Sequence, residues 1–173
     1  MSDRVLIAGI GNMFLGDDGF GVELARKLSR VELGDDVVVA DYGTSGMHLA
    51  YDLTEDYDRA ILLDAMARGE EPGTLTVLEI DPDAPDFAGT SPDAHGMQPD
   101  AVLGLLSRLG GRIEKLYLIG CEPADLDDRM GLSAPVAAAL DDAVPLVIDL
   151  VTRLRGTAAL ATVPTAPTTE KRE

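Results

Sequence analysis

Two adjacent aspartates stand in the part of the sequence that is richest in glycine. Asp17 and Asp18 belong to residues 9–22, GIGNMFLGDDGFGV, where five glycines occur in the thirteen residues from Gly9 to Gly21. Glycine at this density indicates a backbone with positive φ angles or with a very close approach to a ligand. The segment follows an apolar run and precedes a helical pattern, so both carboxylates are expected just beyond a first strand.

The spacing of these glycines does not fit the common phosphate-binding loops. In the dinucleotide pattern G-x-G-x-x-G the third glycine would stand at residue 14, which is Phe14, and a P-loop lysine is absent from the segment. Two adjacent aspartates would also repel a pyrophosphate group. A plainer alternative is that Asp17 or Asp18 only caps the helix that follows, a role worth about 1 kcal/mol.

Two further aspartates follow expected strands. Asp64 closes the apolar run Ala60–Leu63, where an ionised carboxylate at the edge of a core is costly unless a partner is near. Asp41 follows the run Val37–Ala40, and either residue could instead cap a helix or form a turn. In doubly wound sheets, ligands bind at the carboxyl ends of the strands where the winding direction reverses. If the first and third strands are neighbours, Asp18 and Asp64 face the same crevice.

The chain has two histidines and one cysteine. His95 lies in a loop ahead of a helical pattern, a setting in which surface histidines outnumber metal ligands. Asp18, Asp64 and His95 together would form an O,O,N set that suits nickel, zinc, manganese or iron and leaves positions open for a substrate. His48 falls within a helical stretch and is expected to be solvated. Cys121 could act with His95 as a thiolate nucleophile, but a small buried core cysteine is several times more common at a strand end.

Short apolar runs alternate with helical patterns along the chain. Strands are expected over residues 4–10, 37–40, 60–63, 75–80 and 116–120, and helices within 20–31, 99–109 and 133–154. Strands that are apolar on both faces belong to sheets covered on both sides. We therefore expect a three-layer αβα sandwich with a mostly parallel, twisted five-stranded sheet and one antiparallel edge strand. Pro145 should kink or split the last helix, which begins at the cap candidate Ser133.

Length and charge narrow the class of protein further. The 173 residues suit one α/β domain over 1–155, followed by a threonine-rich tail over 156–173 that we expect to be disordered. The net charge of −17 opposes binding to nucleic acid or to an anionic membrane. The first apolar run lacks a cleavage site and no run reaches about 20 residues, so a cytoplasmic protein is expected. One cysteine and two histidines exclude a disulfide framework and a closed zinc site.

Taken in order, these motifs resemble the NiFe-hydrogenase maturation endopeptidases, also called hydrogenase maturation proteases. The matching segments are residues 9–12, 16–22, 41–47, 64–65, 95 and 120–123, so the resemblance spans residues 4 to about 154. Members of that family recognise nickel already inserted into the hydrogenase large-subunit precursor and remove its C-terminal extension. The family has a twisted sheet between helical layers, in agreement with the pattern of strands and helices.

The resemblance implies a role for each candidate residue. Asp18 and Asp64 correspond to acidic nickel ligands, His95 to the imidazole ligand and Asp41 to a further acidic position associated with activity. The nickel would be supplied by the precursor, and zinc or cadmium could occupy the same site. Either the metal polarises the scissile carbonyl or activates a water, or Asp18 or Asp41 serves as general base in an aspartic-type hydrolysis.

Two other functions stay open from the sequence. The glycine-rich loop could belong to a nucleotide-binding α/β module, which would bind a dinucleotide in calorimetry. Alternatively, the protein could be a non-catalytic, metallochaperone-like binder of the same precursor, which would bind the precursor without shortening it. Residues 96–99 depart from the more aliphatic sequence of other family members, and this leaves the client hydrogenase open.

Overall fold

The computed structural model describes residues 4–55, 57–82 and 99–160. Its strands are β1 (Val5–Ile10), β2 (Val37–Gly43), β3 (Arg59–Ala65), β4 (Leu75–Ile80) and β5 (Lys115–Cys121). Its helices are the short 3₁₀ helix η1 (Gly16–Gly19), α1 (Phe20–Leu28), α2 (Gly46–Glu55), α3 (Pro99–Arg108) and α4 (Ala134–Leu160). The predicted strands are confirmed, and their ends differ from the prediction by at most three residues.

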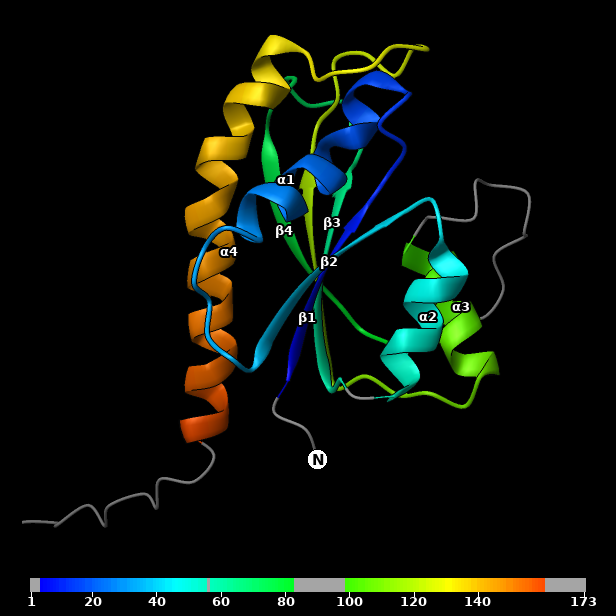
Figure 1. Ribbon diagram of the computed structural model, residues 1–173, viewed down its shortest axis with the longest axis vertical. Coiled ribbons are helices and arrows are strands. Elements are labelled where there is room, and N and C mark those ends of the chain that lie inside the picture. The colour runs from blue at the N-terminus through cyan, green and yellow to red at the C-terminus, as the bar shows by residue number, and fades with distance from the viewer. Residues whose placement is uncertain (1–3, 56, 83–98, 161–173) are drawn as a thin grey trace, which may run out of the picture.

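The strands form one sheet in the order β2-β1-β3-β5-β4. The first four of these are parallel to their neighbours, and β4 pairs antiparallel with β5 at the edge. Helices α1 and α4 cover one face of the sheet, and α2 and α3 cover the other (Figure 1). The predicted three-layer α/β fold with one antiparallel edge strand is therefore confirmed.

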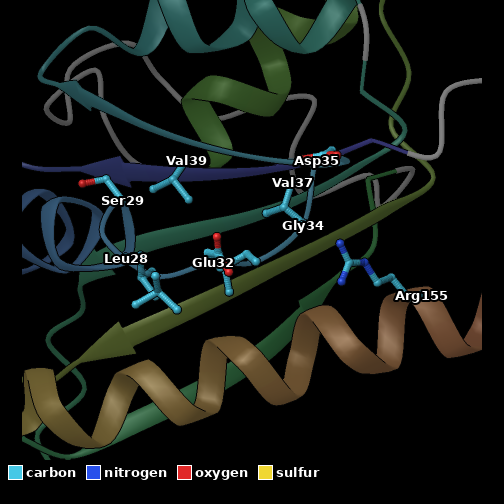
Figure 2. Close-up of a pocket in the computed structure, with 10 residues that line it drawn as sticks. Leu28, Ser29, Glu32, Gly34, Asp35, Val37, Val39 and Arg155 are labelled. Atoms are coloured by element: carbon cyan, nitrogen blue, oxygen red, sulfur yellow. The ribbon is translucent and has the colours of Figure 1, made fainter.

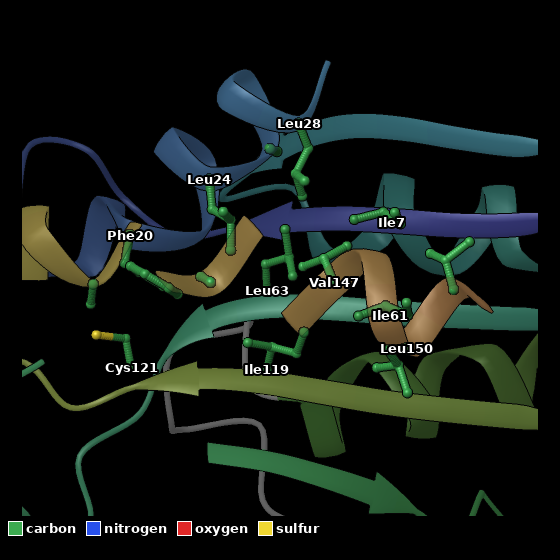
Figure 3. Close-up of a cluster of buried hydrophobic side chains, with 14 of the residues drawn as sticks. Ile7, Phe20, Leu24, Leu28, Ile61, Leu63, Ile119, Cys121, Val147 and Leu150 are labelled. Carbon is green, nitrogen blue, oxygen red and sulfur yellow. The ribbon is translucent and has the colours of Figure 1, made fainter. Parts of the chain in front are cut away.

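Successive side chains of a strand point to opposite faces of the sheet, so each face has its own hydrophobic core. Figure 3 shows Phe20, Leu24 and Leu28, spaced four residues apart on α1, packed towards Ile61 and Leu63 of β3. The intervening strand residues, among them Leu6, Ala8 and Leu62, pack with α2 and α3 on the other face. Because both faces are covered, the parallel strands are almost continuously apolar, as the sequence indicated.

The winding of the chain reverses between β1 and β3. The chain passes from β1 through α1 to β2 at the edge, and then returns through α2 to β3 on the other side of β1. The carboxyl ends of β1 and β3 therefore form the topological switch point of the sheet. These ends lead to Asp18 and Asp64. The adjacency of the first and third strands, on which a shared crevice depends, is therefore confirmed.

Helix α1 begins very close to the sheet because two glycines allow it. A Cβ atom on Gly21 would lie 2.0 Å from the carbonyl oxygen of Leu63 and 2.4 Å from that of Ile10. A Cβ atom on Gly9 would lie 2.5 Å from the carbonyl oxygen of Gly21. Only glycine permits this approach, which places the start of α1, together with η1, over the ends of β1 and β3.

Asp17 is fully buried and joins the loop after β1 to the loop before α4. Its carboxylate accepts hydrogen bonds from the backbone N–H groups of Ala124 (2.8 Å), Asp125 (3.0 Å) and Ser133 (2.7 Å), and from the Ser133 hydroxyl (2.8 Å). Burial acts to raise the pKa of Asp17, but these hydrogen bonds outweigh burial and lower the pKa below its usual value. Asp17 therefore acts as a buried clamp between two loops.

The structure corrects three local expectations. Neither Asp17 nor Asp18 caps a helix, since η1 and α1 have no side-chain cap. Ser133 does precede α4, but its hydroxyl donates to Asp17. Pro145 does not split α4, which continues to Leu160, past the expected domain end at residue 155. Residues 161–173 lie outside the described chain, so the disorder of that segment stays a prediction.

Within residues 4–55, 57–82 and 99–160, no helix is both long enough and apolar enough to cross a membrane.

Removing the buried clamp should destabilise the protein. Asp17→Ala leaves buried N–H groups without an acceptor, so we expect the free energy of unfolding to fall by about 3 kcal/mol or more in urea denaturation. Asp142→Ala is a matched control, because this exposed aspartate on α4 should change stability by less than about 0.5 kcal/mol. The pKa of Asp17 is lower in the folded state, so its contribution is complete above about pH 4 and is lost as the pH falls through the folded value. An Asp17→Asn variant should accordingly lose less of its free energy of unfolding between neutral and acidic pH than wild type does. An equal loss in the two proteins would contradict the role of Asp17 as a clamp.

Two helical glycines should respond oppositely to alanine. Gly21→Ala would force a Cβ atom against the carbonyl oxygens of β1 and β3, so we expect severe loss of stability or failure to fold. Gly156→Ala in α4 meets no atom within 4 Å and should raise the free energy of unfolding by about 0.5 kcal/mol or more. Thermal denaturation measures both changes, and equal tolerance would argue against the close approach of α1.

Candidate active site

Asp64 lies near the carboxyl end of β3, beside the switch point. It is paired in register with Gly120 of β5, and its side chain is partly enclosed. A Cβ atom on Gly11, in the loop after β1, would lie 3.8 Å from the Asp64 carboxylate. The carboxylate of Asp64 therefore lies next to the backbone of the glycine-rich loop.

Asp18 is placed by the turn that this loop makes. Gly11 has a φ of +139°. A Cβ atom on Gly11 would lie only 1.9 Å from the carbonyl oxygen of Asp18. The Asp18 carboxylate accepts a hydrogen bond of 2.8 Å from the backbone N–H of Asn12. The loop thus folds back on itself, and glycine at position 11 is needed for Asp18 to reach its place.

The carboxylates of Asp18 and Asp64 are close enough to interact electrostatically. Burial, together with the negative charge of Asp18, raises the pKa of Asp64 to about 8, although a hydrogen bond from the Ala65 backbone acts in the opposite direction. Asp64 is therefore mostly protonated at neutral pH. A divalent cation bound between the two side chains would compensate both the burial and the repulsion.

Asp41 lies on β2, which β1 separates from β3, and faces away from Asp64. Its carboxylate accepts a hydrogen bond of 2.9 Å from the Gly43 N–H and lies 3.9 Å from Nε of Arg26 on α1. Val37 and Val39 pack with the α1–α4 core, so alternation places Asp41 on that face of the sheet. Alternation from Leu62 places Asp64 on the opposite face. Of the predicted aspartates, the structure brings together Asp18 and Asp64 and leaves Asp41 beyond β1.

The predicted imidazole ligand is His95. His95 lies outside the described residues. Among residues 4–55, 57–82 and 99–160, no three His, Cys, Asp or Glu side chains gather closely enough to hold a metal ion. The role of His95 stays a prediction.

Two other candidates of the sequence analysis have ordinary surroundings. Cys121 is fully buried at the end of β5, where burial and the charges of Asp17 and Glu122 raise the pKa of its thiol to about 11. This pKa opposes the thiolate alternative, because the thiol stays protonated at neutral pH. His48 is exposed on α2, as expected, with Nε2 3.8 Å from the carboxylate of Asp52.

The glycines of the first loop accommodate the chain itself. The space that side chains would fill at Gly11 and Gly16 is taken by the carbonyl oxygens of Asp18 and Asp125, the second 2.5 Å from a Cβ atom on Gly16. From the sequence, either a positive φ or a bound ligand could account for glycine at these positions. The structure shows positive φ and close contacts within the protein, which weakens the nucleotide-binding alternative.

Two buried carboxylates support the site without having been assigned this role from sequence. One is Asp17, described above. The other is Glu122, directly after β5, which accepts hydrogen bonds from the N–H groups of Arg68 (2.7 Å) and Gly69 (3.2 Å) in the loop after β3. The only sequence signal for either was its place in a family motif. Their bonding partners are distant in the chain and could not be read from spacing.

An open pocket of about 670 Å³ lies elsewhere in the molecule. It is lined by the end of α1, the segment leading into β2 and Arg155 of α4 (Figure 2). This places it towards the amino end of β2, whereas Asp18 and Asp64 lie at the carboxyl ends of β1 and β3. Of the predicted site residues that the structure describes, Asp18, Asp41 and Asp64, none lines this pocket, which is separate from their end of the sheet.

Comparisons with known proteins agree with this arrangement. A family model described as hydrogenase maturation protease, HycI, matches residues 22–150. The chain is 38% identical over 148 residues to the hydrogenase expression/formation protein HupD of Rhizobium leguminosarum, covering 84% of this chain and 72% of HupD. It is 34% identical over 166 residues to HoxM of Cupriavidus necator, covering 94% of this chain and 81% of HoxM.

Solved structures show the same relationship. The hydrogenase maturating endopeptidase HybD from E. coli matches with a TM-score of 0.73 and 30% identity, over 87% of this chain and 93% of HybD. A hydrogenase 2 maturation peptidase from a Thaumarchaeota archaeon matches with a TM-score of 0.67 and 35% identity, over 86% of this chain and 97% of that peptidase. The chain therefore belongs to the hydrogenase maturation protease family.

Proposed function

We propose that this protein is a cytoplasmic endopeptidase that recognises nickel in the large-subunit precursor of a NiFe hydrogenase and removes the C-terminal extension. The observation that carries the proposal is the meeting of Asp18 and Asp64 at the β1–β3 switch point. Such crevices bind ligands in doubly wound sheets, and two close carboxylates favour a cation. The similarity to maturation endopeptidases supplies the kind of substrate.

Nickel in this proposal is part of the substrate. Asp18 and Asp64, with His95 as the predicted third donor, complete the coordination of an ion that the precursor already holds. Asp64 must release its proton to bind the ion, so recognition strengthens as the pH rises towards about 8. Coordination then holds the scissile peptide beside the crevice.

Hydrolysis requires a water molecule to be activated next to the peptide. The nickel polarises the scissile carbonyl or the water, and an aspartate takes the proton of the water. We assign this step to Asp41 rather than Asp18, because nickel would occupy the Asp18 carboxylate. Asp41 lies at the same carboxyl end of the sheet and is exposed, but it projects from the opposite face to Asp64. The water that it deprotonates must therefore lie over the end of β1, between the two faces.

The dependence on nickel is the direct test of the function. We expect purified protein to shorten nickel-loaded precursor by the mass of its extension, and to leave nickel-free precursor intact in mass spectrometry. Asp64→Asn and His95→Ala should lose this activity, while circular dichroism should show both variants folded. Equal cleavage of the loaded and nickel-free forms would reject recognition through nickel. Binding of the precursor without shortening would favour the non-catalytic binder.

Asp64→Asn should separate activity from stability. The pKa of Asp64 is higher in the folded protein than in the unfolded chain, so its contribution to stability is complete below about pH 4 and is lost as the pH rises through about 8. The neutral amide avoids that loss. We therefore expect a higher melting temperature than wild type at pH 8 and a smaller difference at pH 5. Asp142→Asn on α4 is the exposed control and should show no such pH dependence. A lower melting temperature than wild type at pH 8 would contradict an unfavourable interaction between Asp18 and Asp64.

Asp41→Asn tests the proposed base. The amide oxygen of asparagine can still accept the hydrogen bond from Gly43, so the turn and the melting temperature should be preserved. We expect kcat to fall by about 100-fold or more, with little change in the affinity for nickel-loaded precursor. Wild-type kcat in this variant would return the base role to Asp18 or to the metal.

A further inference from the structure

Large apolar side chains are exposed on the loops beside Asp18. Phe14 is 62% exposed, Met130 63% and Leu126 48%. We call these three residues the apolar rim. Single exposed apolar side chains are common on protein surfaces, whereas three on two joined loops next to a candidate site call for an explanation.

Hydrogen bonds hold the two loops of the apolar rim together. The backbone N–H of Arg129 donates to the carbonyl oxygen of Phe14 at 3.0 Å, and the N–H of Gly16 donates to the carbonyl oxygen of Arg129 at 2.7 Å. Leu15 and Arg129 form a short parallel bridge. Figure 1 shows the loop before α4 beside the start of α1, where η1 lies. The apolar rim is therefore fixed relative to Asp18.

The buried clamp lies beneath this joint. Asp17 accepts hydrogen bonds from Ala124, Asp125 and Ser133 of the second loop and is followed directly by Asp18. A surface that is already ordered loses little conformational entropy when a partner binds. The fold thus presents apolar groups in a fixed position next to the carboxylates that we propose to bind nickel.

The second loop is also acidic. Residues 124–130, after the buried Glu122, contain three acidic side chains and one basic side chain, a net charge of −2. Asp127 and Asp128 are exposed between Leu126 and Met130, and Asp125 lies 3.4 Å from Arg129. The surface that complements this loop is apolar with basic residues at its margin.

We propose that the apolar rim docks a non-polar, basic-edged surface of the hydrogenase precursor next to its nickel. This inference rests on the proposed function. Metal–oxygen bonds are about 2 Å long, so nickel held by the precursor reaches Asp18 only if the precursor surface lies over the adjoining loops. Those loops carry the apolar rim, which therefore contributes affinity and orients the precursor.

The test compares binding of nickel-loaded precursor by wild-type protein and by the triple variant Phe14→Ser, Leu126→Ser and Met130→Ser. We expect calorimetry to give at least about tenfold weaker binding for the variant, with KM raised and kcat retained at saturating precursor. The exposed positions should leave the melting temperature unchanged. Asp127→Lys with Asp128→Lys should slow association and reduce its dependence on salt.

Leu109→Ser is the matched control for the apolar rim. Leu109 is 47% exposed, close to the value for Leu126. It lies between α3 and the amino end of β5, whereas Asp18 and Asp64 lie at the carboxyl ends of the strands. It should bind the precursor as wild type does. The docking surface would be overturned if the triple variant bound the precursor as tightly as wild type, or if Leu109→Ser lost as much affinity as the triple variant. In either case, cleavage of the loaded precursor by wild-type protein would still support the proposed function. If wild-type protein neither bound nor cleaved the loaded precursor, the proposed function itself would fail.

Discussion

The carboxyl edge of this fold depends on one fully buried carboxylate. Asp17 accepts four hydrogen bonds from the segment between β5 and α4, and these contacts link parts of the chain more than a hundred residues apart. Without a fixed connection, the loop after β1 and the loop before α4 would be two independent surface segments. A buried charge is tolerated here because hydrogen bonds from the protein replace those of water. The loop that carries Asp18 is consequently held in one position.

The two adjacent aspartates have opposite electrostatic surroundings. Asp17 is surrounded by donors, which lower its pKa, and it stabilises the fold as an anion. Asp18 receives one backbone hydrogen bond and adds its negative charge to the burial of Asp64, whose pKa is raised. One residue therefore stabilises the fold, while the next takes part in an unfavourable pair of carboxylates whose repulsion a bound cation would relieve. Two successive acidic residues therefore have different roles in the structure.

Much of the fold could be predicted from local sequence. Apolar runs predict the strands of the sheet, and spacings of four residues predict the buried face of α1. Both predictions depend only on local periodicity. The neighbourhood of Asp18 and Asp64 could be predicted only on the condition that β1 and β3 are adjacent, because strand order is a property of the whole chain. The clamp by Asp17 was missed, since its partners lie more than a hundred residues away. The glycines were expected to serve a positive φ or a ligand, and only the folded chain shows that its own carbonyl oxygens fill that space.

The raised pKa of Asp64 would help such a site to distinguish a free metal ion from an ion that the substrate already holds. At neutral pH a free ion must displace the proton of Asp64 and supply all its remaining ligands from water. An ion already held by a protein brings its other ligands with it, and the apolar rim adds contacts that a free ion cannot make. Under the proposed function, weak attraction for solvated cations is therefore an advantage, because a site filled by a free ion could not coordinate the nickel of the precursor. The same pair of carboxylates that destabilises the metal-free protein at neutral pH would thus make recognition depend on the precursor and its nickel together.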